Sequence, residues 1–133
     1  MPGTGKTVLV VDDIQANRYI VCRILRGANY ITVEAGTGID ACQQARRCRP
    51  DVILLDMNLP DQTGLTTLKQ LRTETQTASI PVMFLSATAQ SSSDRTLAEA
   101  AGASAYLFSP VQADTLLSVI KGVIERGASL NLP

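Results

Sequence analysis

One stretch decides how this chain folds: residues 51–64, with the sequence DVILLDMNLPDQTG. Its first half is an unbroken apolar run, Val52 to Leu55, that ends on the carboxylate of Asp56. A short run of this kind is typical of a strand buried on both faces in the centre of a parallel sheet. Open α/β sheets bind their ligands beyond the carboxyl ends of such strands. Asp56 is therefore the first candidate for a functional residue.

The rest of the chain repeats this pattern, in which a short apolar run is followed by a segment of helical periodicity. The predicted strands cover residues 8–11, 30–34, 52–55, 82–85 and 105–108. We expect helices over about residues 20–28, 39–48, 65–71, 95–101 and 116–124. Strands that alternate with helices in this order form a parallel sheet with helices on both faces. The sequence thus predicts an α/β fold.

Apolar residues at helical spacing predict which face of each helix is buried. In the first helix these residues are Ile20, Val21, Ile24, Leu25 and Ala28, and in the last they are Leu116, Ile120, Val123 and Ile124. The segment 95–101 has only a thin apolar stripe, so we expect its helix to be loosely packed. The tail from Gly127 is expected to fray.

Length and charge limit the classes of function. The 133 residues suit one domain, which we expect to span 1–133, with a core over about 7–126, short flexible termini and no attached output domain. Twelve basic and twelve acidic residues balance, so no basic field indicates nucleic acid or an acidic membrane. No apolar run approaches a membrane span, and no signal-peptide pattern opens the chain. We therefore predict a cytoplasmic protein that contacts neither nucleic acid nor membrane.

The residues that are missing exclude several chemistries. The sequence contains no histidine, which removes Ser-His-Asp catalysis, Cys-His catalysis and the common zinc sites. It also means that this sequence cannot carry a phosphohistidine. The three cysteines, Cys22, Cys42 and Cys48, form no CxxC pair, and we interpret them as reduced thiols.

Polar residues follow four of the predicted strands directly. They are Asp12 and Asp13, Asp56, Ser86 and Ser109. Taken singly, each could cap a helix or close a turn. Together they place three carboxylates and hydroxyl groups at one edge of the sheet, where the carboxylates repel one another unless a cation joins them. Oxygen ligands without histidine or thiolate suit Mg2+, and a carboxylate can accept a phosphoryl group as a nucleophile.

These residues resemble the receiver domain of two-component response regulators over about Thr7 to Arg126. The acid pair of that family matches Asp12-Asp13, and its phosphoacceptor matches Asp56 within a D-x-x-L-P-D-x-x-G run that ends at Gly64. The hydroxyl switch residue matches Ser86, which is followed by the small Ala87. The aromatic switch residue matches Tyr106 within residues 105–110.

The resemblance implies a flavodoxin-like, doubly wound five-stranded parallel sheet of order 2-1-3-4-5. It implies Mg2+ held by Asp13, Asp56 and the backbone carbonyl of Asn58, with Asp12 reached largely through water. Asn58 and Thr88 occupy positions that tune the lifetime of the phosphoryl group in this family. The implied partners are a histidine kinase or a histidine phosphotransfer protein. A homodimer would form through the face made by residues 95–101, 105–108 and the last helix, with Tyr106 on the partner surface.

One position departs from the family pattern. Receivers carry a lysine directly before the proline that follows the fifth strand, and here that residue is Ser109. A serine hydroxyl bears no charge, so the site has three carboxylates and no cation at this position. Arg95 is the first candidate to replace the lysine.

Three functional hypotheses follow. The leading one is a signalling receiver that is phosphorylated on Asp56 with Mg2+ and is not an enzyme. The alternative, favoured by Ser109, is a pseudo-receiver that acts as a protein interaction module without phosphorylation. The third is a phosphatase that forms an aspartyl-phosphate, but haloacid-dehalogenase-like phosphatases carry a second Asp two residues after the first, where this chain has Asn58.

Overall fold

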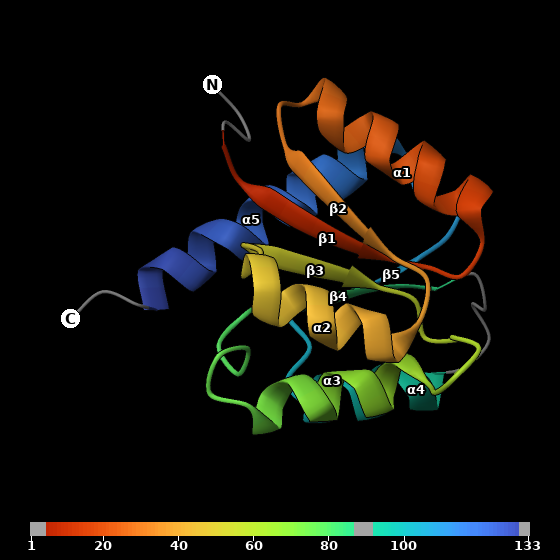
Figure 1. Cartoon of the computed structure of the whole chain (residues 1–133). Helices are drawn as coiled ribbons and strands as arrows, with labels where there is room; N and C mark the ends of the chain where they lie inside the picture. The colour runs from red at the N-terminus through yellow and green to blue at the C-terminus, as the bar shows by residue number, and fades with distance from the viewer. Residues whose placement is uncertain (1–4, 87–91, 131–133) are drawn as a thin grey trace.

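Strands and helices alternate along the chain in the computed structural model, which describes residues 5–86 and 92–130 (Figure 1). In chain order they are β1 (Thr7–Val11), α1 (Gln15–Gly27), β2 (Ile31–Ala35), α2 (Gly38–Cys48), β3 (Val52–Leu55), α3 (Gly64–Thr73), β4 (Val82–Ser86), α4 (Ser92–Ala100), β5 (Ala105–Phe108) and α5 (Ala113–Leu130). The alternation predicted from the apolar runs is confirmed.

The strands form one parallel sheet in the order β2-β1-β3-β4-β5, as the family resemblance implied. β1 and β3 are neighbours, with Val11 paired to Leu55 at their carboxyl ends. All four residues of β3 are buried, because helices cover both faces of the sheet at this strand. The stretch that suggested a central strand therefore occupies the centre of the sheet.

Alternate residues of each strand feed two separate apolar cores. Ile53 and Leu55 belong to the core beneath α2, α3 and α4, whereas Val52 and Leu54 belong to the core beneath α1 and α5. Figure 1 shows the same division, with α1 and α5 on one side of the sheet and α2, α3 and α4 on the other. Because all strands run in parallel, their carboxyl ends meet at one edge, where the loops leading into the helices gather.

One of the expectations for the helices is wrong. Ile20 is 58% exposed, and the fully buried positions of α1 are Cys22 and Leu25. The buried stripe of α1 is therefore narrower than the row of apolar residues, because the core beneath α1 and α5 does not extend to Ile20. α5 is helical through Leu130, since a single glycine costs a helix only about 1 kcal/mol relative to alanine, and fraying of the tail from Gly127 stays a prediction.

The cysteines are free thiols, as we interpreted them from the sequence. Cys22 and Cys42 are buried, and Cys48 is half-buried. Burial raises the pKa of each thiol above its usual value, which favours the protonated form over the reactive thiolate. None of the described helices combines the length and the apolar character that crossing a bilayer requires.

Candidate functional site

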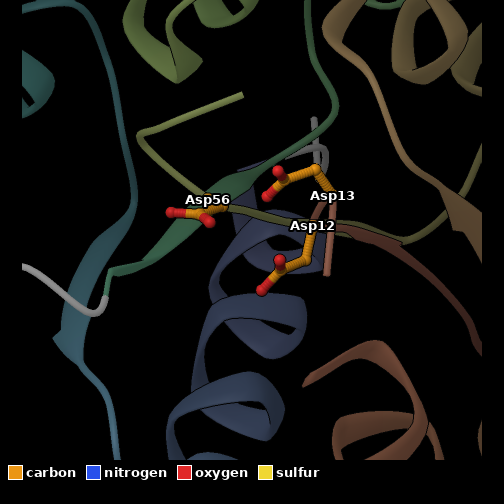
Figure 2. Close-up of side chains that lie close together, drawn as sticks. All are labelled: Asp12, Asp13 and Asp56. Carbon is orange, nitrogen blue, oxygen red and sulfur yellow. The ribbon is translucent and has the colours of Figure 1, made fainter. Parts of the chain in front are cut away.

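Three carboxylates meet at the edge where β1 and β3 end. Asp12 and Asp13 follow β1, Asp56 follows β3, and the two strands are hydrogen-bonded neighbours. The backbone amide of Asp56 donates to the carbonyl of Val11 at 3.0 Å, which aligns the two strand ends. One carboxylate oxygen from each residue lies within 4.8 Å of the others (Figure 2). The structure thus brings together the acidic residues predicted from the sequence.

No basic side chain neutralises these carboxylates among residues 5–86 and 92–130. The ion pairs found there all involve glutamates: Arg18 and Arg26 with Glu34, Arg46 with Glu74, and Arg95 with Glu99. Arg95, considered as a replacement for the absent lysine, pairs within α4 at 3.5 Å. The carboxylates therefore keep a negative charge with which no described side chain forms an ion pair, although the Arg18 guanidinium lies nearby and donates to the backbone carbonyl of Asp12.

Burial and this charge act on Asp56, the most deeply buried of the three residues. Desolvation, followed by the negative charges of Asp12 and Asp13, raises the pKa of Asp56 from 3.8 to about 6, although a hydrogen bond from the amide of Asn58 opposes the shift. Asp12 accepts a hydrogen bond from the amide of Ile14 at 2.9 Å, which fixes its carboxylate at the turn into α1. The group of oxygen donors without nitrogen or sulfur fits Mg2+, which binds few carboxylates and retains waters.

The loop between β3 and α3 is closed by its own backbone. Asn58 and Thr63 form an isolated antiparallel bridge, and the amide of Gly64 donates to the carbonyl of Met57 at 2.7 Å. A side chain at position 64 would overlap the carbonyl oxygen of Asp56 and lie 2.9 Å from both the Met57 Cα and the Phe84 ring. Glycine is therefore required at position 64, where the first residue of α3 packs against the backbone of Asp56.

A second carboxylate ties the same loop to α2. Asp61 accepts hydrogen bonds from the amides of Gly38 at 2.8 Å and Ile39 at 2.9 Å, which open α2. Slight desolvation would raise the pKa of Asp61, but these amide hydrogen bonds outweigh it and the pKa lies below its usual value. The amides at a helix start favour a negative charge. Sequence reasoning missed this contact, because residues 23 positions apart gave no local signal.

The two proposed switch residues lie on neighbouring strands. Ser86 ends β4, is 1% exposed, and its carbonyl accepts a hydrogen bond from the amide of Ser109 at 2.8 Å. The Tyr106 ring lies between Phe84 and Phe108, with ring centroids 5.5 and 5.3 Å away. It is 7% exposed and belongs to the core on the side of the sheet opposite α5. The expectation that Tyr106 lies on a partner surface with the last helix is wrong for this conformation, because the aromatic cluster buries it. Ala87 and Thr88 lie outside the described residues.

Comparison with known proteins agrees with this geometry. The family model of the response regulator receiver domain matches residues 8–121. Protein PilH of Pseudomonas aeruginosa is 32% identical over 117 residues, covering 88% of this chain and 96% of that protein. The probable transcriptional regulatory protein TcrX of Mycobacterium tuberculosis is 36% identical over 124 residues, covering 93% of this chain but 52% of that protein.

Two solved structures are similar over nearly the whole fold. The chemotaxis protein CheY4 of Vibrio cholerae has a TM-score of 0.84 at 32% identity and covers 90% of this chain and 99% of that one. The receiver domain of sensor histidine kinase PA1611 from Pseudomonas aeruginosa has a TM-score of 0.84 at 29% identity, with 92% and 99% covered. That structure has a magnesium ion coordinated in its active site cleft.

Proposed function

Because this chain belongs to the response regulator receiver domain family, we propose that it is a signalling domain that accepts a phosphoryl group on Asp56. The observation that supports the proposal best is the cluster of Asp12, Asp13 and Asp56, whose oxygens lie within 4.8 Å of one another at the edge of the sheet. Such a cluster destabilises a fold unless it binds a cation. A divalent cation there would favour the approach of a phosphoryl group to Asp56.

The chemistry is transfer of a phosphoryl group between two nucleophiles. A carboxylate oxygen of Asp56 would attack the phosphorus of a phosphohistidine, forming an acyl phosphate while the phosphorus–nitrogen bond breaks and the imidazole leaves. Since this sequence contains no histidine, a phosphohistidine donor lies outside residues 1–133. We propose a histidine kinase or a histidine phosphotransfer protein in this role, in the cytoplasm.

Asp12, Asp13, Asp56 and the backbone carbonyl of Asn58 would hold Mg2+, with Asp12 largely through water. When bound, the ion offsets the negative charge on the carboxylates and on the incoming phosphoryl oxygens. The bridge between Asn58 and Thr63 supports this assignment, because it fixes the loop that carries the Asn58 carbonyl. The raised pKa of Asp56 would fall once a cation lies beside it.

Ser86 and Tyr106 would couple phosphorylation to the surface of the domain. A hydroxyl at the end of β4 can donate to a phosphoryl oxygen one strand away from Asp56. Movement of that strand end would reach Tyr106, which is paired with Phe84 in the register of β4 and β5. Dimerisation through the face of α4, β5 and α5 stays a prediction. In this proposal the domain carries a signal and does not turn over a substrate as an enzyme.

The test is phosphate incorporation from acetyl phosphate in Mg2+, measured by intact mass. Asp56→Asn should reduce incorporation by about two orders of magnitude or more, because an amide is not a nucleophile here. Asp51→Asn is the matched control: Asp51 flanks the other end of β3 and accepts a hydrogen bond from the Thr7 amide. Its labelling should equal that of the wild type.

Ser109 favours one alternative, a receiver-like interaction module that acts without phosphorylation. No incorporation into the folded, Mg2+-bound wild type would support that alternative. Undiminished labelling of Asp56→Asn would instead remove Asp56 as the acceptor. Continuous release of inorganic phosphate at a catalytic rate would indicate the third hypothesis, a phosphatase.

A further inference from the structure

A cavity opens beside Asp56, between α1 and the segment that follows β5. Its volume is about 260 Å3, and Asp12, Asp56 and Ser109 lie along it together with an apolar wall. Ile24 of α1 and Leu116 of α5 are two residues of that wall. The cavity therefore joins two carboxylates to an apolar surface.

This combination limits what the cavity can bind. Pockets for drug-sized ligands enclose about 300–1,000 Å3, so the space suits one side chain or a small molecule. The three carboxylates form no ion pair with a described basic side chain, and their charge exceeds that of one Mg2+ ion, so a second cation can still bind beside them. A second hydrated metal ion would gain nothing from the apolar wall of the cavity. A primary alkylammonium ion matches both parts of the cavity. Its carbon stem packs on the apolar wall, and its charged head donates hydrogen bonds to the carboxylates.

The mouth of the cavity indicates where the ammonium comes from. Ile14 and Ile20 line the cavity, yet they are 52% and 58% exposed, and Tyr19 beside them is 58% exposed. These three residues form an apolar rim on α1 and the turn before it. A small free amine would leave the rim in water, whereas a protein that docks there would cover it. The rim favours a side chain supplied by another protein.

We propose that this cavity receives a lysine side chain from the protein that docks over Asp56, and that its ammonium pairs with the carboxylates of Asp12 and Asp56. The site thereby obtains a cation from outside, whereas no basic side chain among residues 5–86 and 92–130 pairs with these carboxylates. The lysine stem lies along Ile24 and Leu116, and the rest of the partner covers the apolar rim. This inference rests on the proposed function only for the identity of the docking protein.

The first experiment measures binding of Nα-acetyl-lysine amide to the full chain by NMR, in saturating Mg2+ and at constant ionic strength. Its neutral isostere, Nα-acetyl-norleucine amide, and ammonium chloride are the controls. We expect the lysine probe to bind at least about tenfold more tightly than either control, with shifts centred on Ile24, Val111 and Leu116. Equal binding of ammonium chloride would overturn the proposal, because the carboxylates would then attract any cation.

Two lysine substitutions, one at each end of β5, test the location. Ser109→Lys places an ammonium in the same space and should abolish binding of the lysine probe. Ser104→Lys is the matched control: it adds the same charge at the opposite end of β5, outside the cavity, and should leave binding as in the wild type. Binding that survives Ser109→Lys in a folded protein would place the probe elsewhere and overturn the proposal.

The source of the ammonium and the proposed function are tested separately. If n-butylammonium binds while the lysine probe does not, the mouth is too narrow for a residue in a chain, and a lysine supplied by a partner is excluded. Phosphate incorporation into Asp56 without probe binding would retain the proposed function and overturn this inference. Probe binding without incorporation would retain the inference for a docking protein that transfers no phosphate.

Discussion

The two walls of the crevice around Asp56 are built from different contacts. On one side, the loop 57–63 is held by directed hydrogen bonds, among them those of Asp61 to the start of α2 and of Gly64 to Met57. On the other side, α1 and the segment after β5 are separated by an apolar-walled cavity. Hydrogen bonds fix both distance and direction, whereas apolar contact fixes neither as narrowly. The first wall can therefore position a ligand atom, and the second can admit a group from outside.

The largest change in stability that we expect comes from a substitution at Gly64, which is closely packed in the first wall. Gly64→Ala should lower the free energy of unfolding by about 2–3 kcal/mol, because the added Cβ meets the backbone of Asp56 and Met57, which cannot rotate away. Urea denaturation of the metal-free protein measures this change.

Gly122→Ala is the matched control for that substitution. Gly122 lies within α5, and the nearest atom to its added Cβ is the flexible end of Arg126 at 3.4 Å. Alanine there should leave stability unchanged or raise it by up to about 1 kcal/mol. If Gly64→Ala behaved like Gly122→Ala, the first wall would be less rigid than the contacts indicate.

The contrast between the walls also separates what the sequence could predict from what it could not. The short apolar runs were sufficient for the sheet, and the acids directly after them were sufficient for the cluster of Asp12, Asp13 and Asp56, because parallel strands bring their carboxyl ends together. Helical periodicity placed Ile20 in the core, whereas the structure leaves it exposed at the mouth of the cavity. Periodicity defines a helix face but not how far the opposing core extends along it.

Contacts between residues far apart in the sequence were also not predicted. The hydrogen bonds of Asp61 join residues 23 and 22 positions apart, and an acid in a loop after a proline is more simply explained as part of a turn. The cavity depends on side-chain volumes from α1, β4 and α5 together, and no single stretch of sequence contains them. The burial of Tyr106 was missed for a similar reason, since its two aromatic neighbours lie on different strands.

Removing the carboxylate at position 61 should loosen the first wall without breaking it. Asp61→Ala should reduce stability by about 1–2 kcal/mol, because two amides at the start of α2 lose their acceptor. We also expect Mg2+ affinity to fall, as the loop that carries the Asn58 carbonyl becomes less fixed. Urea denaturation and calorimetric titration of Mg2+ measure the two effects.

Asp40→Ala is the control for this change, since Asp40 lies in the first turn of α2 and its carboxylate accepts a hydrogen bond from the Gln44 side chain at 3.5 Å, within the same helix. It should cost less than about 0.5 kcal/mol and leave Mg2+ affinity unchanged. Equal losses of stability in both variants would mean that a negative charge near the start of α2 stabilises the protein. The contact between α2 and the loop would then contribute nothing.

The smallest expected effect is the pH dependence that Asp56 gives to the metal-free protein. Its pKa is raised to about 6 in the folded state and lies near 3.9 in an unfolded chain. Between these values the folded protein binds more protons than the unfolded one, so stability should fall as pH rises from about 4 to about 6 and then stay level. Because solvent screens this half-buried group, we expect a total loss of about 1 kcal/mol.

Asp56→Asn removes the titrating group and should flatten this part of the pH profile, so that the variant matches the wild type near pH 4 and exceeds it by about 1 kcal/mol near pH 7. Mg2+ should reverse the order at pH 7, because the ion binds the ionised carboxylate of the folded wild type and thereby stabilises it. Urea denaturation across this pH range, with and without Mg2+, measures both effects. Parallel profiles for the two proteins would show that the open second wall hydrates Asp56 enough to cancel its burial.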